Sequence, residues 1–201
     1  MRLAGKLRQL LRIRAVLKSR ATSSVKRSLW NKEFADGRWD YIDNTPDDCI
    51  YPYLEKYCKG GSLLDLGCGS GNTGNELAID KYNFYWGVDI ADVAVQKAIE
   101  RSKANGRSSK NRYSQGDIYS YEPTRKYDVI LFRESIWYIP ESKIQSMLDR
   151  YRGHLEEDGV FVVRICDQEL HGAIVKLIDD NYELLEKHTP DGATTIVLVF
   201  R

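Results

Sequence analysis

Three aspartates near the ends of predicted strands are the first residues of this chain whose spacing indicates chemistry. Asp65, Asp89 and Asp117 each end or follow an extended segment. In an open α/β sheet, ligands bind at the carboxyl ends of the parallel strands. Asp89 lies 22 positions after Gly67, a spacing at which an acid accepts hydrogen bonds from ribose hydroxyls. Asp117 can accept from an exocyclic amine while Ile118 packs on a purine, so the three acids predict a pocket for an adenosine.

The turn after the first aspartate indicates which chemical group is attached to the adenosine. It reads Gly67-Cys68-Gly69-Ser70-Gly71, and its glycines allow positive φ and the close approach of a ligand. A dinucleotide site would require G-x-G-x-x-G with a pyrophosphate at the helix N-terminus, and a P-loop would require Lys-Ser/Thr after the glycines. Neither pattern is present and no basic residue lies near the turn. The acid in front of the turn therefore indicates an ammonium group instead of a phosphate.

The segment after residues 127–132 supplies the candidates for work on a second substrate. It reads Arg133-Glu134-Ser135-Ile136-Trp137-Tyr138-Ile139. Glu134 is a candidate general base or acceptor-orienting residue; the alternative is that it caps a turn or pairs with Arg133. Tyr138 is predicted to act at the acceptor pocket or to pack in the core, and Trp137 to contact the substrate. His171 is a second candidate base.

Residues 29–45 combine aromatic side chains with acids and one arginine, which is unusual for a plain connector. One interpretation is a lid over the active site, with Trp39 and Tyr41 as apolar walls and Arg38 as the partner of a carboxylate. The other is an aromatic clasp that docks the N-terminal arm to the core. The sequence favours neither.

The elements that must position these residues alternate between strands and helices. This alternation predicts a parallel sheet, and the closing hairpin adds one antiparallel strand. The predicted strands cover residues 62–66, 83–88, 111–115, 127–132, 160–165, 182–188 and 194–200. The predicted helices cover residues 46–59, 72–79, 91–104, 140–152 and 168–178.

The charge of the chain is distributed unevenly. Residues 1–30 carry nine basic and no acidic side chains, so residues 31–201 carry 21 basic and 29 acidic groups, a net charge of −8. Residues 1–20 predict a basic amphipathic helix. It contacts an anionic lipid surface, binds an RNA backbone, or packs its leucines on the domain or on a second subunit. Residues 21–24 are predicted to be a linker. The expected organisation is an arm over residues 1–28 and one domain over residues 29–201.

Composition limits the class of protein. The chain has 201 residues with 42% hydrophobic and 29% charged side chains, as in soluble single-domain proteins. No apolar run approaches the roughly 20 residues that cross a bilayer. The four cysteines lack C-x-x-C spacing and nearby histidines, so we expect no metal site and a reducing compartment. The expected location is the cytoplasm, with the arm at the inner face of a membrane as an option.

Several segments resemble the motifs of class I S-adenosylmethionine-dependent methyltransferases. Leu64–Gly71 resembles their first motif, Gly87–Ile90 the second and Gln115–Ile118 the adenine-contacting third; Tyr127–Ile130 and Leu155–Val160 are similar to their later segments. The resemblance covers residues 46–201. It implies a Rossmann-like α/β fold with sheet order 3-2-1-4-5-7-6, strand 7 antiparallel, and helices on both faces.

The resemblance also implies the ligand of the predicted pocket, S-adenosylmethionine, with no metal. The backbone at Gly67 and Gly69 would hold the methionine end, Asp89 the ribose, and Asp117 with Ile118 the adenine. The full predicted cofactor-binding set is Asp65, Gly67, Cys68, Gly69, Asp89, Ile90, Asp117, Ile118 and Arg133. The predicted catalytic residues are Glu134, Tyr138 and His171, and the predicted substrate-binding residues are Trp39, Tyr41 and Trp137.

A shorter resemblance concerns the acceptor. Gly37–Tyr41 and Glu134–Ile139 are similar to segments of bacterial methyltransferases of polysaccharide and nodulation-factor pathways. This favours methyl transfer to a hydroxyl or amine of a sugar or glycan. The alternatives are another small metabolite, or a catalytically silent cofactor-binding module. The segment after residues 127–132 lacks the Asn/Asp-Pro-Pro-aromatic sequence, which disfavours nucleic acid and protein amides as acceptors.

Overall fold

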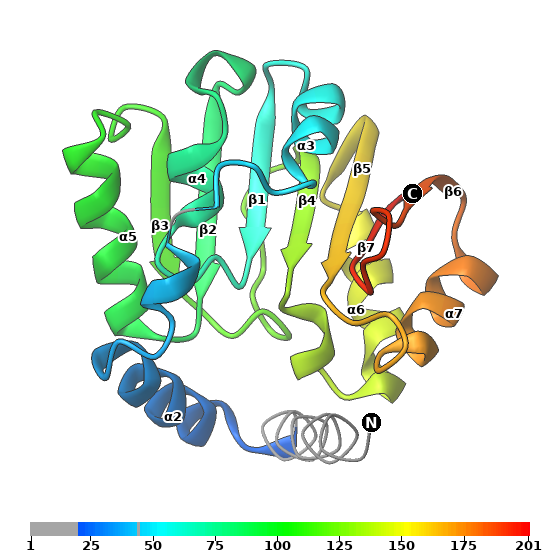
Figure 1. Ribbon diagram of the computed structural model, residues 1–201, viewed down its shortest axis with the longest axis horizontal. Coiled ribbons are helices and arrows are strands. Elements are labelled where there is room, and N and C mark those ends of the chain that lie inside the picture. The colour runs from blue at the N-terminus through cyan, green and yellow to red at the C-terminus, as the bar shows by residue number, and fades with distance from the viewer. Residues whose placement is uncertain (1–19, 44) are drawn as a thin grey trace.

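The computed structural model describes residues 20–43 and 45–201 and contains one seven-stranded sheet (Figure 1). The strand order is β3-β2-β1-β4-β5-β7-β6. Only β7 runs antiparallel to its neighbours β5 and β6, so the predicted sheet order is confirmed. The strands are β1 (Ser62–Leu66), β2 (Phe84–Asp89), β3 (Asn111–Gln115), β4 (Tyr127–Arg133), β5 (Leu155–Ile165), β6 (Leu184–His188) and β7 (Ile196–Phe200).

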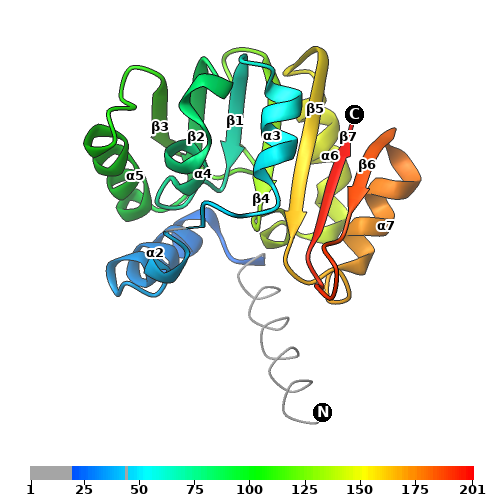
Figure 2. The ribbon, with the colours of Figure 1, turned by 45° about the horizontal axis from the view of Figure 1, so that its top comes forward.

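The helices lie on both faces of this sheet (Figure 2). One apolar cluster joins α6 and α7 to one face of the sheet, and a second joins α3 to the other. All five residues of β1 and all five of β7 are buried, because helices cover both faces of the sheet; β7 is accordingly apolar throughout, and β1 is apolar except for Ser62 and Asp65. The helices are α2 (Ser23–Ala35), α3 (Tyr51–Cys58), α4 (Asn72–Glu76), α5 (Asp92–Ala104), α6 (Glu141–Arg152) and α7 (Gly172–Asn181). Three short 3₁₀ helices are η1 (Asp40–Ile42), η2 (Ile79–Lys81) and η3 (Ile136–Tyr138).

Helix α2 was not predicted. It begins at Ser23, so the expected linker over residues 21–24 is wrong in its second half, and the expected boundary between residues 28 and 29 lies inside a helix. Figure 1 shows α2 beneath the arrowhead end of the sheet, which is the carboxyl edge of the parallel strands. The basic helix expected over residues 1–20 lies almost entirely outside the described residues.

Several other elements differ from the prediction in their bounds: α4 ends at Glu76 and not at residue 79, α7 covers Gly172–Asn181 and not 168–178, and β6 and β7 each begin two residues later than predicted. The largest differences are in β5 and α3. Strand β5 begins at Leu155, not at residue 160, because Leu155 pairs with Tyr127 before a register shift. Helix α3 begins at Tyr51, not at residue 46, and residues 45–50 form turns that cross toward β5. No helix among the described residues is long and apolar enough to span a membrane. The described part of the chain also contains no group of three or more acidic, histidine or cysteine side chains that could hold a metal ion.

Candidate active site

The glycine turn between β1 and α4 adopts a backbone that only glycine accepts easily. Gly67, Gly69 and Gly71 have φ values of +89°, +53° and +79°. A Cβ on Gly67 would lie 2.5 Å from the Cβ of Ser135, and one on Gly71 would lie 2.8 Å from the Cβ of Ala98. The turn is therefore fixed by both dihedral and packing constraints, and its backbone is presented at the carboxyl edge of β1.

Asp89, at the end of β2, ties this turn to the loop before α5. Its Oδ2 accepts a hydrogen bond from the backbone N–H of Gly69 at 2.9 Å, and its Oδ1 accepts one from Ala91 at 2.9 Å. The side chain is buried, and burial raises the pKa of this carboxyl to about 6. Each carboxylate oxygen has further lone pairs, so Asp89 can still accept from a ligand hydroxyl.

Asp65 has a less complete set of partners. Its Oδ2 accepts a hydrogen bond from the hydroxyl of Tyr85 at 2.6 Å. Its Oδ1 is buried without a hydrogen-bond partner among the described residues. Burial raises the pKa of this carboxyl to about 6, and the hydrogen bond from Tyr85 and the charge of Arg133 oppose part of that rise. A buried carboxylate oxygen that lacks a donor fits the predicted role of receiving an ammonium group.

Asp117 lies two residues beyond the end of β3, which places all three predicted acids at one edge of the sheet. Its Oδ2 accepts a hydrogen bond from the hydroxyl of Ser23 at 2.6 Å, and its Oδ1 accepts one from the backbone of Tyr119 at 3.0 Å. Ile118 beside it is buried. The first residue of α2 therefore contacts the acid predicted to bind an adenine amine.

Arg133 points toward α3 and the turns before it. Its Nη2 donates to Thr45 Oγ1 at 2.8 Å and to Asp48 Oδ2 at 2.7 Å, and its Nη1 donates to the hydroxyl of Tyr51 at 3.1 Å. The only described residue of the glycine turn and α4 that it contacts in this way is Thr73, at 3.5 Å. These contacts place Arg133 mainly in a polar network with residues 45–51.

Glu134 pairs with Arg164, not with Arg133 as one alternative expected. Arg164 Nη1 donates to Glu134 Oε1, and the backbone N–H of Cys166 donates to Oε2 at 3.1 Å. Arg164 also donates through Nε to Asp48 Oδ1 at 3.0 Å. Glu134 has φ of +60°, an uncommon backbone for a residue other than glycine. Burial raises the pKa of its carboxyl, and Arg164 opposes that rise.

The aromatic residues after β4 extend the site toward α7. The ring of Trp137 stacks on His171 with centroids 4.6 Å apart, and it lies 5.9 Å from the ring of Tyr138. Tyr138 contacts the edge of Trp30 in α2 at 4.9 Å. Burial raises the pKa of Tyr138 to about 12. The structure therefore gathers the predicted Trp137, Tyr138 and His171 into one row of rings.

Trp39 packs against two aromatic side chains of α2, Trp30 and Phe34, in one aromatic group. Its ring lies 5.5 Å from Trp30 and 6.5 Å from Phe34, and its Nε1 donates to Glu33 at 3.2 Å. Tyr41 lies 6.2 Å from Trp39 and is 75% exposed. Arg38 also contacts Glu33, at 3.3 Å. The group packs on Ala91 and Ala94, so this segment has the docking contacts of a clasp.

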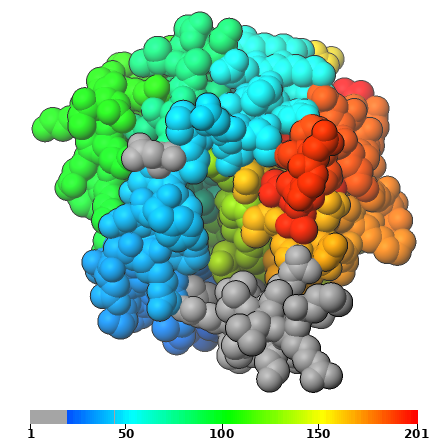
Figure 3. Space-filling view, viewed as in Figure 1, coloured from blue at the N-terminus to red at the C-terminus, as the bar shows by residue number. Residues whose placement is uncertain are grey.

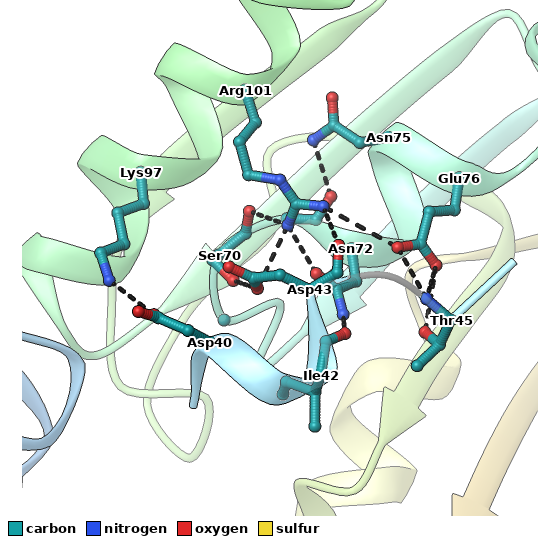
Figure 4. Close-up of polar contacts among 12 residues, drawn as sticks. Asp40, Ile42, Asp43, Thr45, Ser70, Asn72, Asn75, Glu76, Lys97 and Arg101 are labelled. Atoms are coloured by element: carbon teal, nitrogen blue, oxygen red, sulfur yellow. Dashed lines mark hydrogen bonds and ion pairs between the residues drawn. The ribbon is translucent and has the colours of Figure 1, made fainter. Parts of the chain in front are cut away.

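The same segment also adjoins the cofactor turn, as a lid would. The ring of Phe34 lies 3.6 Å from the position of a Cβ on Gly69. Asp43 accepts a hydrogen bond from the hydroxyl of Ser70, and the carbonyl of Ile42 accepts one from the side chain of Asn72 (Figure 4). The structure therefore combines features of both interpretations of residues 29–45.

The sequence analysis missed two arginines, Arg101 and Arg164, that hold separate segments of the site together. Arg101 of α5 donates to the carbonyl of Asp43 at 2.7 Å and to the carbonyl of Ser70 at 3.0 Å (Figure 4). Arg164 of β5 joins Asp48 to Glu134. No motif marks either arginine, and their side-chain partners lie at least 25 residues away in the chain. A basic residue at the predicted end of a central strand was the one signal available for Arg164.

A pocket of about 390 Å³ opens beside Arg164. It is lined by residues 45–49, Arg164, Pro190 and Thr195. In the space-filling view a hollow separates the α2–η1 segment from the β6–β7 hairpin loop (Figure 3). The pocket lies on the hairpin side of the site, and the glycine turn lies on the α2 side.

Known proteins resemble this chain in both sequence and fold. A sequence model of a family described as "Methyltransferase domain" matches residues 58–196. The N-methyltransferase NodS from Bradyrhizobium japonicum WM9, solved with S-adenosyl-L-homocysteine, is 18% identical with a TM-score of 0.70; the alignment covers 87% of this chain and 97% of that one. Magnesium protoporphyrin IX methyltransferase (ChlM) from Synechocystis PCC 6803, solved with bound SAM, is 16% identical with a TM-score of 0.70, covering 90% and 99%.

Curated relatives come from fungi. The mRNA cap guanine-N(7) methyltransferases of Cryptococcus neoformans and Candida albicans are 27% and 29% identical over 64% and 63% of this chain. The chain spans only 20% and 32% of the length of these two proteins. The family model, in contrast, covers more than half of the chain, and the sheet has the strand order expected of that family. The chain therefore belongs to the methyltransferase-domain family and has the class I S-adenosylmethionine-dependent methyltransferase fold.

Proposed function

We propose that this protein transfers a methyl group from S-adenosylmethionine to a hydroxyl or amine of a sugar or glycan. The observation that carries the proposal is the edge formed by the glycine turn, Asp65 and Asp89. It offers a glycine backbone, a buried carboxylate oxygen without a donor and a second buried carboxylate. The family match supports the reaction class, and the solved relatives with SAH or SAM support the cofactor.

The residues at this edge fit the proposed cofactor group by group. Asp65 Oδ1 would receive the ammonium group beside Gly67, Cys68 and Gly69. Asp89, with Ile90 after it, would accept from the ribose hydroxyls. Asp117 and Ile118 would contact the adenine, and we keep Arg133 as a predicted member of the set through its contact with Thr73. The cofactor, when bound, supplies a methyl group already activated on a sulfonium.

The chain's own contribution to transfer is positioning and proton removal. A hydroxyl or ammonium acceptor must lose a proton, and a carboxylate whose pKa is raised by burial suits that task. Glu134 meets this condition, and Arg164 and the Cys166 N–H hold its two oxygens in place. We assign Glu134 as the general base, with Trp137 and Tyr138 along the acceptor path. His171, stacked on Trp137, is the alternative base.

One observation favours a second candidate acceptor. The curated relatives are described as mRNA cap guanine-N(7) methyltransferases, which suggests a guanine base. The exposed ring of Tyr41 beside Trp39 offers a surface on which a flat base can stack. Guanine N7 already carries a lone pair, so this candidate needs no general base.

The experiment that tests the proposal is done in two stages. Isothermal titration with S-adenosylhomocysteine should show one site, and Asp89→Ala should weaken it at least tenfold, whereas Asp80→Ala on the surface should not. Transfer from S-adenosylmethionine labelled on the methyl group is then measured with monosaccharides, nucleotide sugars and guanosine nucleotides. Turnover of sugars supports the proposal. Absence of cofactor binding contradicts it, and turnover of guanosine nucleotides alone moves the assignment to the second candidate.

A further inference from the structure

The pocket beside Arg164 lies at the same edge of the sheet as the proposed base. Arg164 pairs in register with Arg133 across β5 and β4, and Glu134 directly follows Arg133. The guanidinium of Arg164 both lines the pocket and contacts the carboxylate of Glu134. A group bound in this pocket therefore lies next to the guanidinium that holds Glu134. The pocket is the described cavity best placed to hold the acceptor.

Arg164 is held rigidly before any ligand binds. Asp48 fixes its Nε at 3.0 Å and Glu134 fixes its Nη1, which leaves Nη2 outside both carboxylate contacts. Asp48 is itself fixed by Arg133 and by the backbone N–H of Ile50 at 3.1 Å. Donors that are ordered in advance lose little entropy when a ligand binds. Arg164 is therefore suited to orient a ligand oxygen.

The charge balance disfavours an anionic acceptor. The charged residues that line the pocket are Asp47, Asp48 and Arg164. Arg164 already faces two carboxylates, Asp48 and Glu134, and Arg133 completes a group with no net charge. A phosphate or carboxylate would add a third negative charge next to Arg164. A neutral ligand with hydroxyl groups meets no such cost, because donors and acceptors are both present.

The shape and surface of the pocket disfavour a flat base. None of the described residues that line it is aromatic; its apolar surface comes from Pro46, Cys49 and Pro190. A purine would find no ring on which to stack. A volume of about 390 Å³ falls in the lower part of the range for small-molecule sites. It suits a compound the size of one or two saturated rings.

We propose that this pocket binds the acceptor as a neutral, saturated ring that bears hydroxyl groups, oriented by Arg164 and bounded by Thr195. The proposal rests on the proposed function and deepens it, because it places the acceptor and selects a polyhydroxylated ring over guanine. Arg164 and Thr195 become specificity-determining residues. Thr195 stands in the loop just before β7 and contacts the carbonyl of Cys166 only at 3.5 Å, so its side chain can be enlarged with little loss of structure.

The test is direct binding, measured without turnover. Thr195→Trp fills the pocket, and Ala193→Trp is the matched control, since Ala193 is exposed in the same loop and does not line the pocket. Saturation-transfer NMR is recorded on the complex with S-adenosylhomocysteine, using D-glucose, N-acetyl-D-glucosamine and guanosine as probes, because both sugars are neutral. We expect signals from the sugars and none from guanosine. The sugar signals should fall at least fivefold in Thr195→Trp and stay unchanged in Ala193→Trp.

The titration with S-adenosylhomocysteine separates this proposal from the one on which it rests. Both tryptophan variants should bind the homocysteine compound as the unaltered protein does. If the unaltered protein does not bind S-adenosylhomocysteine, the proposed function itself is contradicted. If that binding is intact, the pocket assignment is overturned by guanosine signals that exceed the sugar signals, by an absence of sugar signals, or by sugar signals that survive in Thr195→Trp.

Discussion

Asp65 shows at the scale of one residue how a binding site can oppose stability. The fold buries its carboxyl with one oxygen on Tyr85 and the other without a described partner, which raises its pKa from 3.8 to about 6. The folded state then binds this proton more tightly than the unfolded state does. Its contribution to stability is complete below pH 3.8 and is lost as the pH rises toward about 6.

Asp65→Asn should remove this pH dependence. Relative to the unaltered protein, the free energy of unfolding of the variant should increase by about 3 kcal/mol between about pH 4 and about pH 8. Urea denaturation at the two pH values measures the difference, with exposed Asp80→Asn as the control. The variant should also lose affinity for S-adenosylhomocysteine. An equal difference at both pH values would show that Asp65 titrates normally in the fold.

Glu134 gives a second prediction at this scale. Replacement by Gln keeps the shape but cannot accept a proton, so kcat should fall by about 10²- to 10⁴-fold with little change in cofactor affinity. His171→Asn is the comparison variant. If the His171 variant loses activity and the Glu134 variant does not, the assignment of the base is reversed. If neither loses activity, transfer proceeds by positioning alone.

The contact between Arg164 and Glu134 predicts the direction in which the pH profile of activity should shift in an Arg164 variant. Its guanidinium lowers the pKa of Glu134 against the opposing effect of burial. In Arg164→Gln the pKa of Glu134 should therefore rise, and the acid limb of the kcat/KM profile should move to higher pH. A loss of activity without a moved limb would mean that Arg164 acts only on acceptor binding.

Helix α2 is the element that covers the carboxyl edge of the sheet, and two kinds of contact dock it. Arg27 pairs with Asp92 at 2.6 Å, but both side chains are nearly half exposed, and solvent screens such pairs so that they contribute little to stability. Phe34 is buried against Ala91 and Ala94 and beside Gly69. Apolar burial should therefore dominate the docking of α2.

Phe34→Ala should loosen α2 much more than Arg27→Ala does. Removal of a buried phenylalanine costs about 3–5 kcal/mol. Hydrogen exchange across residues 23–35 should accelerate strongly in Phe34→Ala and slightly in Arg27→Ala, and cofactor binding should weaken in the same order. Equal acceleration in the two variants would show that the ion pair carries the docking.

At the scale of the whole molecule, one ligand should stabilise most of the sheet, because the glycine turn, Asp89 and Asp117 connect β1, β2 and β3 at one edge. A free ligand concentration of about 100 times Kd adds about 2.7 kcal/mol to the free energy of unfolding. For a chain of this size that raises Tm by roughly 5–10 °C. Differential scanning calorimetry with S-adenosylhomocysteine measures it, and Asp89→Ala should reduce the shift at the same ligand concentration. An unchanged Tm at saturation would contradict the cofactor assignment.

The sequence by itself determined the sheet and the local glycine turn at which we propose that the cofactor binds. The apolar run Val129–Phe132 is buried on both faces, as are Leu63, Leu64 and Leu66 around Asp65. A local glycine turn with an acid before it needs no distant partner to be recognised. Elements whose form depends on distant contacts were missed. Helix α2 buries only Glu33 and Phe34, so its apolar periodicity is weak, and β5 begins early because Leu155 pairs with β4 despite the turn signal at Asp158-Gly159.

Only the tertiary structure decided how the acceptor side is built. The pairing of Glu134 with Arg164, the network of Asp48 with Arg133 and the pocket bounded by Thr195 join segments far apart in the chain. Strand register brings Arg133 beside Arg164, and register depends on the packing of the whole sheet. Local sequence is sufficient for the turn that faces the donor, because its constraints are backbone dihedrals. The acceptor side is assembled from side chains that meet only after the sheet has formed.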